Sequence, residues 1–231
     1  VDVTFHARPG TVTAIVGPSG SGKTTIARLI SRFWDVDSGA VMVDGVDIRE
    51  LGTEQLMSRL SMVFQDVYLF DDSLIANIRV GRPDASDEEV FRAADLSGVT
   101  SIANRLGWHT PVGEGGRLLS GGERQRVSVA RALLKQAPIV LFDEATSALD
   151  AENEANILAA MDELREQSTF IVIAHKLDTI KSADQIVVLD EHGQVSQLGT
   201  HSELSDVPGI YRHFWQQRKA ARGWKINSGR D

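Results

Sequence analysis

The sequence predicts an α/β fold built on a wound, mainly parallel β-sheet. Two short runs, residues 139–142 and 170–174, are continuously apolar, which is typical of strands buried on both faces of a parallel sheet. A segment with helical spacing, residues 152–166, lies between them. Strand, helix and strand in this order are the repeating unit of wound α/β folds.

The first third of the chain adds four predicted strands and one helix. Residues 1–5 have the alternating pattern of a strand, and residues 11–16 form a β-rich run that ends at a glycine. The helix is expected at residues 24–33, with one apolar face made of Ile26, Leu29, Ile30 and Phe33. The other two strands are expected at residues 41–43 and 61–64.

The middle of the chain is mostly helical. Residues 84–106 predict helices, in which Ser86 is the N-cap and Glu89 follows three residues later. A second helix is expected at residues 121–135. The residues predicted to face inward on these helices are Val90, Ala93, Ala94, Val127, Ala130, Leu133 and Leu134.

The last part predicts one more strand and a helical tail. The strand is expected at residues 186–189 and a turn at residues 191–194. In the tail, residues 208–224, four apolar side chains recur at helical spacing, which predicts packing against the domain. They are Ile210, Tyr211, Phe214 and Trp215.

The length of 231 residues suits a single α/β domain. We expect a core lobe at about 1–66 and 137–205, a helical lobe at about 67–136, a tail at about 206–231, and an antiparallel β portion beside the parallel sheet. The chain opens on Val1 rather than Met and leads at once into a strand pattern. These features predict an N-terminally truncated piece of a longer polypeptide.

Composition excludes several classes of protein. Hydrophobic residues make up 42% and charged residues 24%, which is ordinary globular usage and excludes a disordered or fibrous chain. The net charge of −8 disfavours nucleic acid as a partner. With no cysteine there are no disulfides, and a reducing compartment is expected. No apolar run approaches the roughly 18–20 residues of a membrane span.

A glycine-rich loop follows the second predicted strand and precedes the first helix. It matches the pattern G-x-x-x-x-G-K-[ST] with Gly17, Pro18, Ser19, Gly20, Ser21, Gly22, Lys23 and Thr24. Its backbone N–H groups can surround phosphates, Lys23 can reach the β- and γ-phosphates, and the Thr24 hydroxyl can bind Mg²⁺. Thr25 is a further nucleotide-binding candidate. The alternative is a glycine-rich turn with a solvated lysine.

The strand predicted at residues 139–142 ends in two carboxylates. Asp143 would lie at the carboxyl edge of the sheet beside the loop, where it can hold Mg²⁺. Glu144 is then free to act as the general base that activates water. The alternative is that both acids simply end a strand.

A third motif identifies the family that the chain resembles. It consists of Leu119, Ser120, Gly121, Gly122, Glu123, Arg124 and Gln125. This stretch resembles the signature motif of ATP-binding cassette (ABC) ATPases. Ser120, Gly121 and Gly122 offer a hydroxyl and N–H groups at a helix start, which is a second anion site. The resemblance implies that the loop of one domain and the signature of another enclose one ATP.

The resemblance covers almost the whole chain and implies three further site residues. Gln65 matches the Q-loop glutamine, which binds Mg²⁺. Asp150, after Ser147, Ala148 and Leu149, matches the D-loop aspartate, which contacts the opposite domain. His175 matches the switch histidine, which contacts the γ-phosphate. The family's adenine-stacking aromatic residue normally precedes the first strand seen here.

Two segments are similar to exporter-type members of the family. One is the loop Thr110, Pro111, Val112, Gly113, Glu114, Gly115 and Gly116. The other, residues 64–78, resembles the segment that receives the coupling helices of a membrane domain, with Tyr68, Leu69 and Phe70 as an apolar docking surface. The alternative is that these three pack within the helical lobe. The tail from Phe214 is similar to tails of bacterial iron–siderophore transporters.

The resemblance implies an ATPase that pairs with a second, identical or different, nucleotide-binding domain. It would drive transport through a membrane domain, fused upstream or on another chain, at the cytoplasmic side of the cell membrane. Catalysis would depend on Glu144, His175 and Lys23. The alternatives are a soluble, non-transport ABC ATPase and a regulatory nucleotide-binding module with little turnover.

Overall fold

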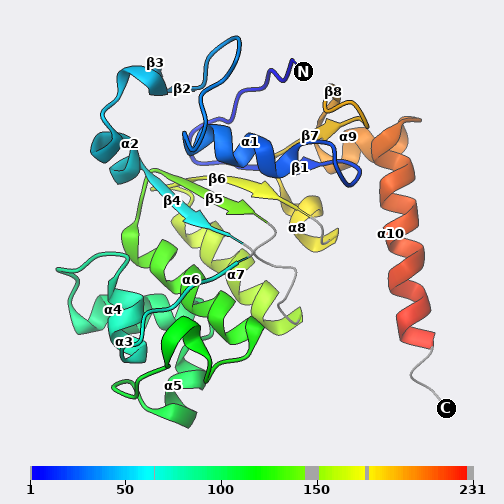
Figure 1. Ribbon diagram of the computed structural model, residues 1–231. Helices are drawn as coiled ribbons and strands as arrows, with labels where there is room; N and C mark the ends of the chain where they lie inside the picture. Colours follow the sequence, from blue (N-terminus) through cyan, green and yellow to red (C-terminus); the bar gives the residue numbers. More distant parts are fainter. Residues whose placement is uncertain (1, 65, 144–150, 175–176, 228–231) are drawn as a thin grey trace.

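The computed structural model describes residues 2–64, 66–143, 151–174 and 177–227 and shows a six-stranded sheet with helices on both faces (Figure 1). The strand order is β4-β5-β6-β1-β7-β8. The first five are mutually parallel, and only β8 is antiparallel to its neighbour. The strands are β1 (Val12–Val16), β4 (Leu60–Val63), β5 (Ile139–Asp143), β6 (Thr169–Ile173), β7 (Gln185–Leu189) and β8 (Val195–Gly199).

The predicted wound, mainly parallel sheet with an antiparallel portion is confirmed. The portion includes a separate hairpin of β2 (Met42–Val43) and β3 (Val46–Asp47). The turn expected at residues 191–194 joins β7 to β8, and the Asp190 carboxylate accepts the N–H groups of His192 (2.9 Å) and Gln194 (2.8 Å) there. Because β1, β5, β6 and β7 have neighbours on both sides, their apolar runs are buried nearly throughout.

Alternate side chains of the central strand point into two different hydrophobic clusters. Ile15 packs with Ile30 of α1 (Lys23–Ile30) on one face. Ala14 and Val16 join the larger cluster on the other face, which contains the inward residues of α6 (Gly121–Lys135). Figure 1 shows α1 above the sheet and α6, α7 (Ala151–Leu164) and α8 (Leu177–Ser182) below it. The helices α1 and α6 therefore lie on opposite faces.

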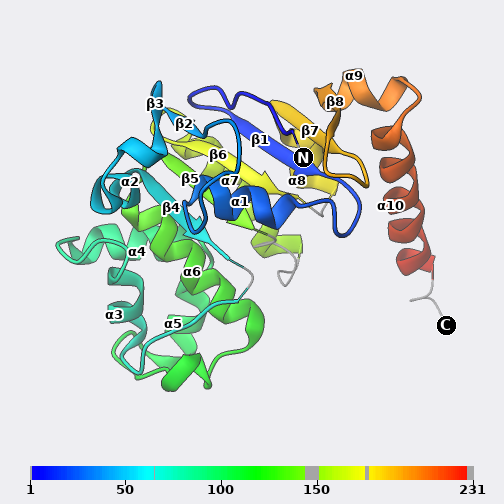
Figure 2. The ribbon, with the colours of Figure 1, turned by 45° about the horizontal axis from the view of Figure 1, so that its top comes forward.

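The helices of the middle region gather around α6 (Figure 2). They are α3 (Leu74–Arg79), α4 (Asp87–Leu96) and α5 (Thr100–Leu106), followed by the short 3₁₀ turn η2 (Glu114–Gly116). The residues predicted to face inward on α4 and α6 are all buried. The lobe boundaries drawn from the sequence stay a prediction.

The tail forms α10 (Ile210–Asn227), which follows α9 (His201–Asp206). Tyr211 is completely buried, and Phe214 and Trp215 pack against the main core, as predicted. Ile210 is instead exposed. None of the helices in the described ranges is both long and apolar enough to cross a membrane.

Some predicted elements are wrong. Residues 2–8 belong to no strand, although Val3, Phe5 and Ala7 are the half-buried members of the alternation. The first helix ends at Ile30, so Phe33 is 52% exposed rather than inward. Arg32 has a φ of 54°, and the N–H of Phe33 bonds back to the Arg28 carbonyl (2.9 Å), which closes the helix early.

Several short elements were not expected from the sequence. They are α2 (Thr53–Arg59) and α3, α8 and α9, the strands β3 and β8, and the 3₁₀ turn η1 (Ile48–Glu50). Each spans at most seven residues, too few for a periodic signal to stand out.

Candidate functional site

The glycine-rich loop connects the central strand β1 to α1, as its pattern predicts. At Gly17 the chain is so close-packed that a Cβ would lie 2.8 Å from the Ser21 Oγ and 2.9 Å from the Leu189 carbonyl oxygen. Gly20 and Gly22 have φ values of 83° and 87°, which side-chain-bearing residues rarely adopt. The backbone of this loop therefore requires glycine at these positions.

The start of α1 is suited to an anion. Its N-cap, Gly22, offers no side chain to the N–H groups of the first turn, and this turn contains no acidic residue. The positive end of the helix dipole therefore favours a negatively charged ligand at this position. The buried Lys23 ammonium lies against the loop and donates to the carbonyl oxygens of Gly17 (3.1 Å) and Pro18 (2.7 Å). Pro18, Ser19 and Thr25 are exposed.

The Ser21 hydroxyl is also placed to meet a ligand. Its oxygen is buried and has no hydrogen-bond partner in the part of the chain that the structure describes. A buried hydroxyl without a partner is costly unless something else satisfies it. An oxyanion held by this loop would accept its proton.

Two oxygen groups from distant parts of the sequence meet beside the loop. The Thr24 hydroxyl donates to the Asp143 carboxylate at 3.3 Å, across 119 positions of the chain. Asp143 is the last residue of β5 and is only 6% exposed. A hydroxyl and a carboxylate are the hard oxygen donors that Mg²⁺ prefers, so these residues fit the expected ion.

The carboxyl ends of four neighbouring strands share this edge of the sheet. Val63 of β4 pairs with Phe142 of β5, and Asp143 pairs with Ile173 of β6, which lies next to β1. Phe64 follows β4 and Ala174 follows β6. The predicted residues Gln65, Glu144, Asp150 and His175 lie outside the described residues, so their roles stay predictions.

The predicted signature begins α6. Ser120 is the N-cap of this helix, and its hydroxyl accepts the Glu123 N–H at 3.3 Å while the Glu123 carboxylate accepts the Ser120 N–H at 2.8 Å. Gly121 is exposed and Gly122 half-buried. Since α6 and α1 cover opposite faces of the sheet, the signature and the loop begin helices that lie on opposite sides of the sheet.

Sequence reasoning missed the hydrogen bonds that connect α6 to the segment after β4. The buried Gln125 amide donates to the Phe64 carbonyl (3.1 Å), next to the predicted Gln65. Further along α6, the Arg131 guanidinium donates to the Asn77 carbonyl (2.6 Å), the Asn77 side-chain oxygen (2.6 Å) and the Tyr68 carbonyl (2.8 Å). The arginine spacing along the helix gives no signal for these contacts, because they depend on tertiary packing.

A cavity of about 320 Å³ lies between α6 and this segment. Its lining includes Tyr68, Val80, Gly81, Arg131 and Lys135. Burial lowers the pKa of Arg131 to about 10 and also lowers the pKa of Lys135.

The apolar docking surface predicted from the sequence is only partly present. Tyr68 (58%) and Phe70 (52%) are exposed, and their rings meet edge to face. Leu69 is completely buried in the core, so its predicted place on that surface is wrong. Because successive residues of an extended segment point to opposite sides, the middle one of the three faces inward.

Comparisons with known proteins agree with this architecture. Residues 1–147 match the ABC transporter family. The chain is 47% identical over 223 residues to the ATP-dependent lipid A-core flippase of Legionella pneumophila (strain Paris), covering 96% of this chain and 38% of that protein. It is 48% identical over 228 residues to the mycobactin import ATP-binding/permease protein IrtB of Mycolicibacterium thermoresistibile, covering 98% and 39%.

A solved structure, a bacterial Atm1-family ABC exporter with ATP bound, superimposes with a TM-score of 0.89 and 44% identity, over 94% of this chain and 38% of that one. The chain spans less than two fifths of the length of each of these three proteins. A loop built for phosphate, an acidic strand end beside it, and family similarity over nearly the full length agree with one another. The chain belongs to the ABC transporter family.

Proposed function

We propose that this chain is the ATP-hydrolysing nucleotide-binding domain of an exporter-type ABC transporter. The observation that supports this most is the meeting of Thr24 and Asp143 at 3.3 Å, directly beside a loop whose helix end is free of acidic residues. Together these groups offer one place for a triphosphate and one for its magnesium ion.

Each residue of the proposed site has a distinct role. The loop N–H groups and Lys23 bind the phosphates, and Lys23 stabilises charge that develops on the transferred group. Thr24, Asp143 and Gln65 hold Mg²⁺, which supplies charge neutralisation at the phosphates. Glu144 orients and deprotonates the attacking water, and His175 contacts the γ-phosphate.

Two such domains enclose the nucleotide between them. The signature residues Ser120, Gly121 and Gly122 of one domain complete the site formed by the loop of the other, and Asp150 lies at the contact. Support comes from the exposed position of the signature at the start of α6, on the face of the sheet opposite to α1. The second domain is a copy of this chain or a related one.

The exposed Tyr68 and Phe70 beside the 320 Å³ cavity are the proposed contact for a transmembrane domain. Arg131 supports the backbone of Tyr68 through its hydrogen bond to the Tyr68 carbonyl (2.8 Å). This contact would hold the chain at the cytoplasmic side of the membrane and would transmit the closing motion of the two domains.

The proposal is tested by nucleotide turnover in the intact protein with Mg²⁺. Lys23→Ala should abolish hydrolysis by weakening phosphate binding. Glu144→Gln should abolish hydrolysis while preserving ATP binding, and should give an ATP-dependent pair that persists. Undiminished hydrolysis in Glu144→Gln would exclude its role as the base, and wild-type protein without Mg-ATPase activity would favour a regulatory module.

We propose a siderophore as the cargo. The mycobactin import protein is 48% identical over 98% of this chain. The sequence of the tail from Phe214 resembles the tails of bacterial iron–siderophore transporters. Siderophore flux that is unchanged by Lys23→Ala would refute this cargo. The alternative of a soluble, non-transport ATPase predicts turnover that does not depend on a membrane domain.

A further inference from the structure

The same arrangement of serine, glutamate and arginine occurs at the start of two helices. In each, a capping box joins the N-cap serine to a glutamate three residues later, and an arginine from outside the helix pairs with that glutamate. On α4 the members are Ser86, Glu89 and Arg82. On α6 they are Ser120, Glu123 and Arg105.

The α6 copy differs because its helix start is the proposed signature. The Glu123 carboxylate accepts the Ser120 N–H at 2.8 Å, and its other oxygen lies 2.5 Å from an Arg105 guanidinium nitrogen. The Glu123 side chain is 16% exposed, whereas that of Arg105, on α5, is 53% exposed. A carboxylate is thus fixed at the anion-binding end of the helix, and its charge is compensated from another helix.

The ionisation of Glu123 is secured by these contacts. Burial alone would raise the pKa of the Glu123 carboxyl, but the hydrogen bonds from Ser120 and Arg105 outweigh it, and the pKa lies below its usual value. The carboxylate is therefore charged at neutral pH. A negative charge at this helix end competes with any phosphate for the favourable potential there.

We propose that Arg105 sets the strength with which Ser120, Gly121 and Gly122 hold the triphosphate of the opposite domain, by neutralising Glu123. This inference rests on the proposed function. Arg105 is a positioning residue here, because it acts through Glu123 rather than on the nucleotide. Without Arg105 the incoming triphosphate would meet an uncompensated carboxylate.

The substitutions can separate charge from capping. Glutamine caps as glutamate does in this motif, so Glu123→Gln removes the charge and preserves the bond to the Ser120 N–H. We would measure, in the Glu144→Gln background of the intact protein, the ATP concentration for half-maximal pairing. Arg105→Gln should raise it about two- to fivefold, as expected for one charge at a helix end. The difference should shrink at high salt.

The double variant gives the decisive comparison. Once Glu123→Gln is present, Arg105→Gln should have no further effect, because no charge remains to be neutralised. An equal effect of Arg105→Gln with and without Glu123→Gln would overturn the proposal. The proposal would also be overturned if adding Arg105→Gln to the Glu144→Gln protein left the ATP concentration for half-maximal pairing unchanged.

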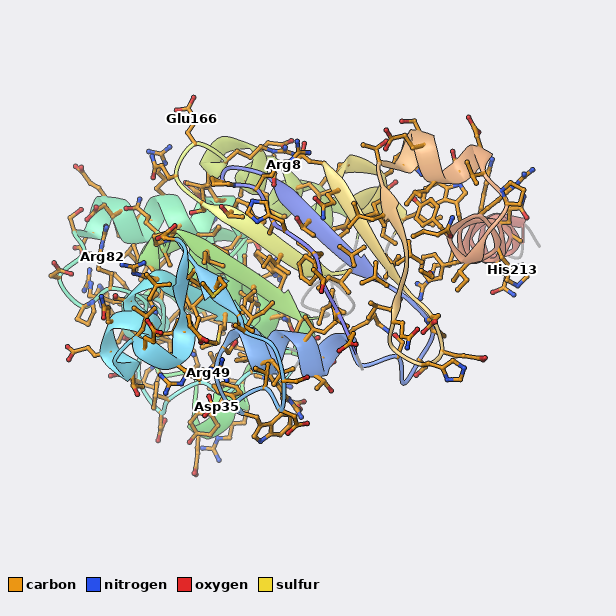
Figure 3. All side chains as sticks on the ribbon, turned by 90° about the horizontal axis from the view of Figure 1, so that it is seen from above. Arg8, Asp35, Arg49, Arg82, Glu166 and His213 are labelled. Carbon is orange, nitrogen blue, oxygen red and sulfur yellow. The ribbon has the colours of Figure 1, made fainter. Side chains whose placement is uncertain are left out.

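The α4 copy supplies matched controls. Glu89→Gln and Arg82→Gln alter the same capping box and ion pair away from the signature; Figure 3 shows Arg82 at the outer edge of the molecule. Both should leave the ATP concentration for half-maximal pairing unchanged, and an effect of Arg82→Gln equal to that of Arg105→Gln would contradict the proposal.

Ser120→Ala distinguishes a failure of the proposed function from a failure of the role of Arg105. If it leaves pairing intact, the proposed function fails; if it abolishes pairing while Arg105→Gln changes nothing, only this inference fails.

Discussion

Asn77 organises the segment between β4 and α3, and its removal should be among the costliest single changes in the chain. Its side chain is completely buried. The amide nitrogen donates to the carbonyls of Phe70 (3.0 Å), Asp72 (3.3 Å) and Ser73 (3.1 Å). The amide oxygen accepts from the Phe70 N–H (2.9 Å) and from the Arg131 guanidinium (2.6 Å).

Asn77→Ala removes all five bonds and leaves several buried groups without partners. A neutral hydrogen bond contributes about 0.5–1.5 kcal/mol net, and a bond to a charged group about 1.5–3 kcal/mol. Three of the five bonds share the amide nitrogen as donor and two share the amide oxygen as acceptor, so their contributions are not additive. We therefore expect a loss of about 3–4 kcal/mol in the free energy of unfolding. For a domain of this size this corresponds to a fall of roughly 6–16 °C in melting temperature.

Urea denaturation followed by circular dichroism measures this loss directly. Asn104→Ala is the matched control, because Asn104 is an exposed asparagine on α5 and its loss should change the free energy by less than about 0.5 kcal/mol. A cost below about 1 kcal/mol for Asn77→Ala would refute the view that this network holds the segment in place.

Three further predictions concern packing, pH and metal. A Cβ at Gly81 would overlap the backbone of α6, whereas a Cβ at Gly52 would have nothing within 4 Å. Gly81→Ala should therefore lower the free energy of unfolding by about 1–3 kcal/mol, measured by thermal or urea unfolding. Gly52→Ala, the control, should change it very little. Burial, together with the nearby charge of Lys181, lowers the pKa of His201. The contribution of His201 to stability is therefore complete above about pH 6.5 and is lost as the pH falls. Between pH 7.5 and 5 the melting temperature should fall more steeply in the wild type than in His201→Gln, and equal slopes would contradict this. Asp143→Asn should raise the Mg²⁺ concentration for half-maximal hydrolysis at least about tenfold, and an unchanged requirement would exclude Asp143 as a metal residue.

The sequence predicts the centre of this protein better than its periphery, for a physical reason. Strands buried on both faces must be continuously apolar, so β5 and β6 are visible as runs. The amphipathic helices α4 and α6 show a stripe and a capping serine. Short elements such as α3 and α8 carry no such pattern, since their positions are set by what they pack against.

The candidate site divides in the same way. The loop can be predicted from the sequence because the positive φ values at Gly20 and Gly22 favour glycine. Asp143 can be predicted because it ends an apolar strand. The contacts of Arg105 and Arg131 cannot be predicted from the sequence, because each depends on a partner that only tertiary folding brings near. The resemblance to a family supplied the rest of the expected site, and Leu69 shows its limit, since neighbouring residues of one motif face opposite ways.

The paired design is tested most directly by mixing two defective proteins. One carries Lys23→Ala and cannot hold the triphosphate; the other carries Ser120→Ala and cannot seal it. In a two-fold pair, each site takes its loop from one partner and its signature from the other, so only mixed pairs contain one complete site. With Glu144→Gln also present, the account predicts that ATP produces pairs in the mixture and that these pairs contain the two proteins in equal amounts. ATP-dependent pairing of either protein alone, or none in the mixture, would contradict it.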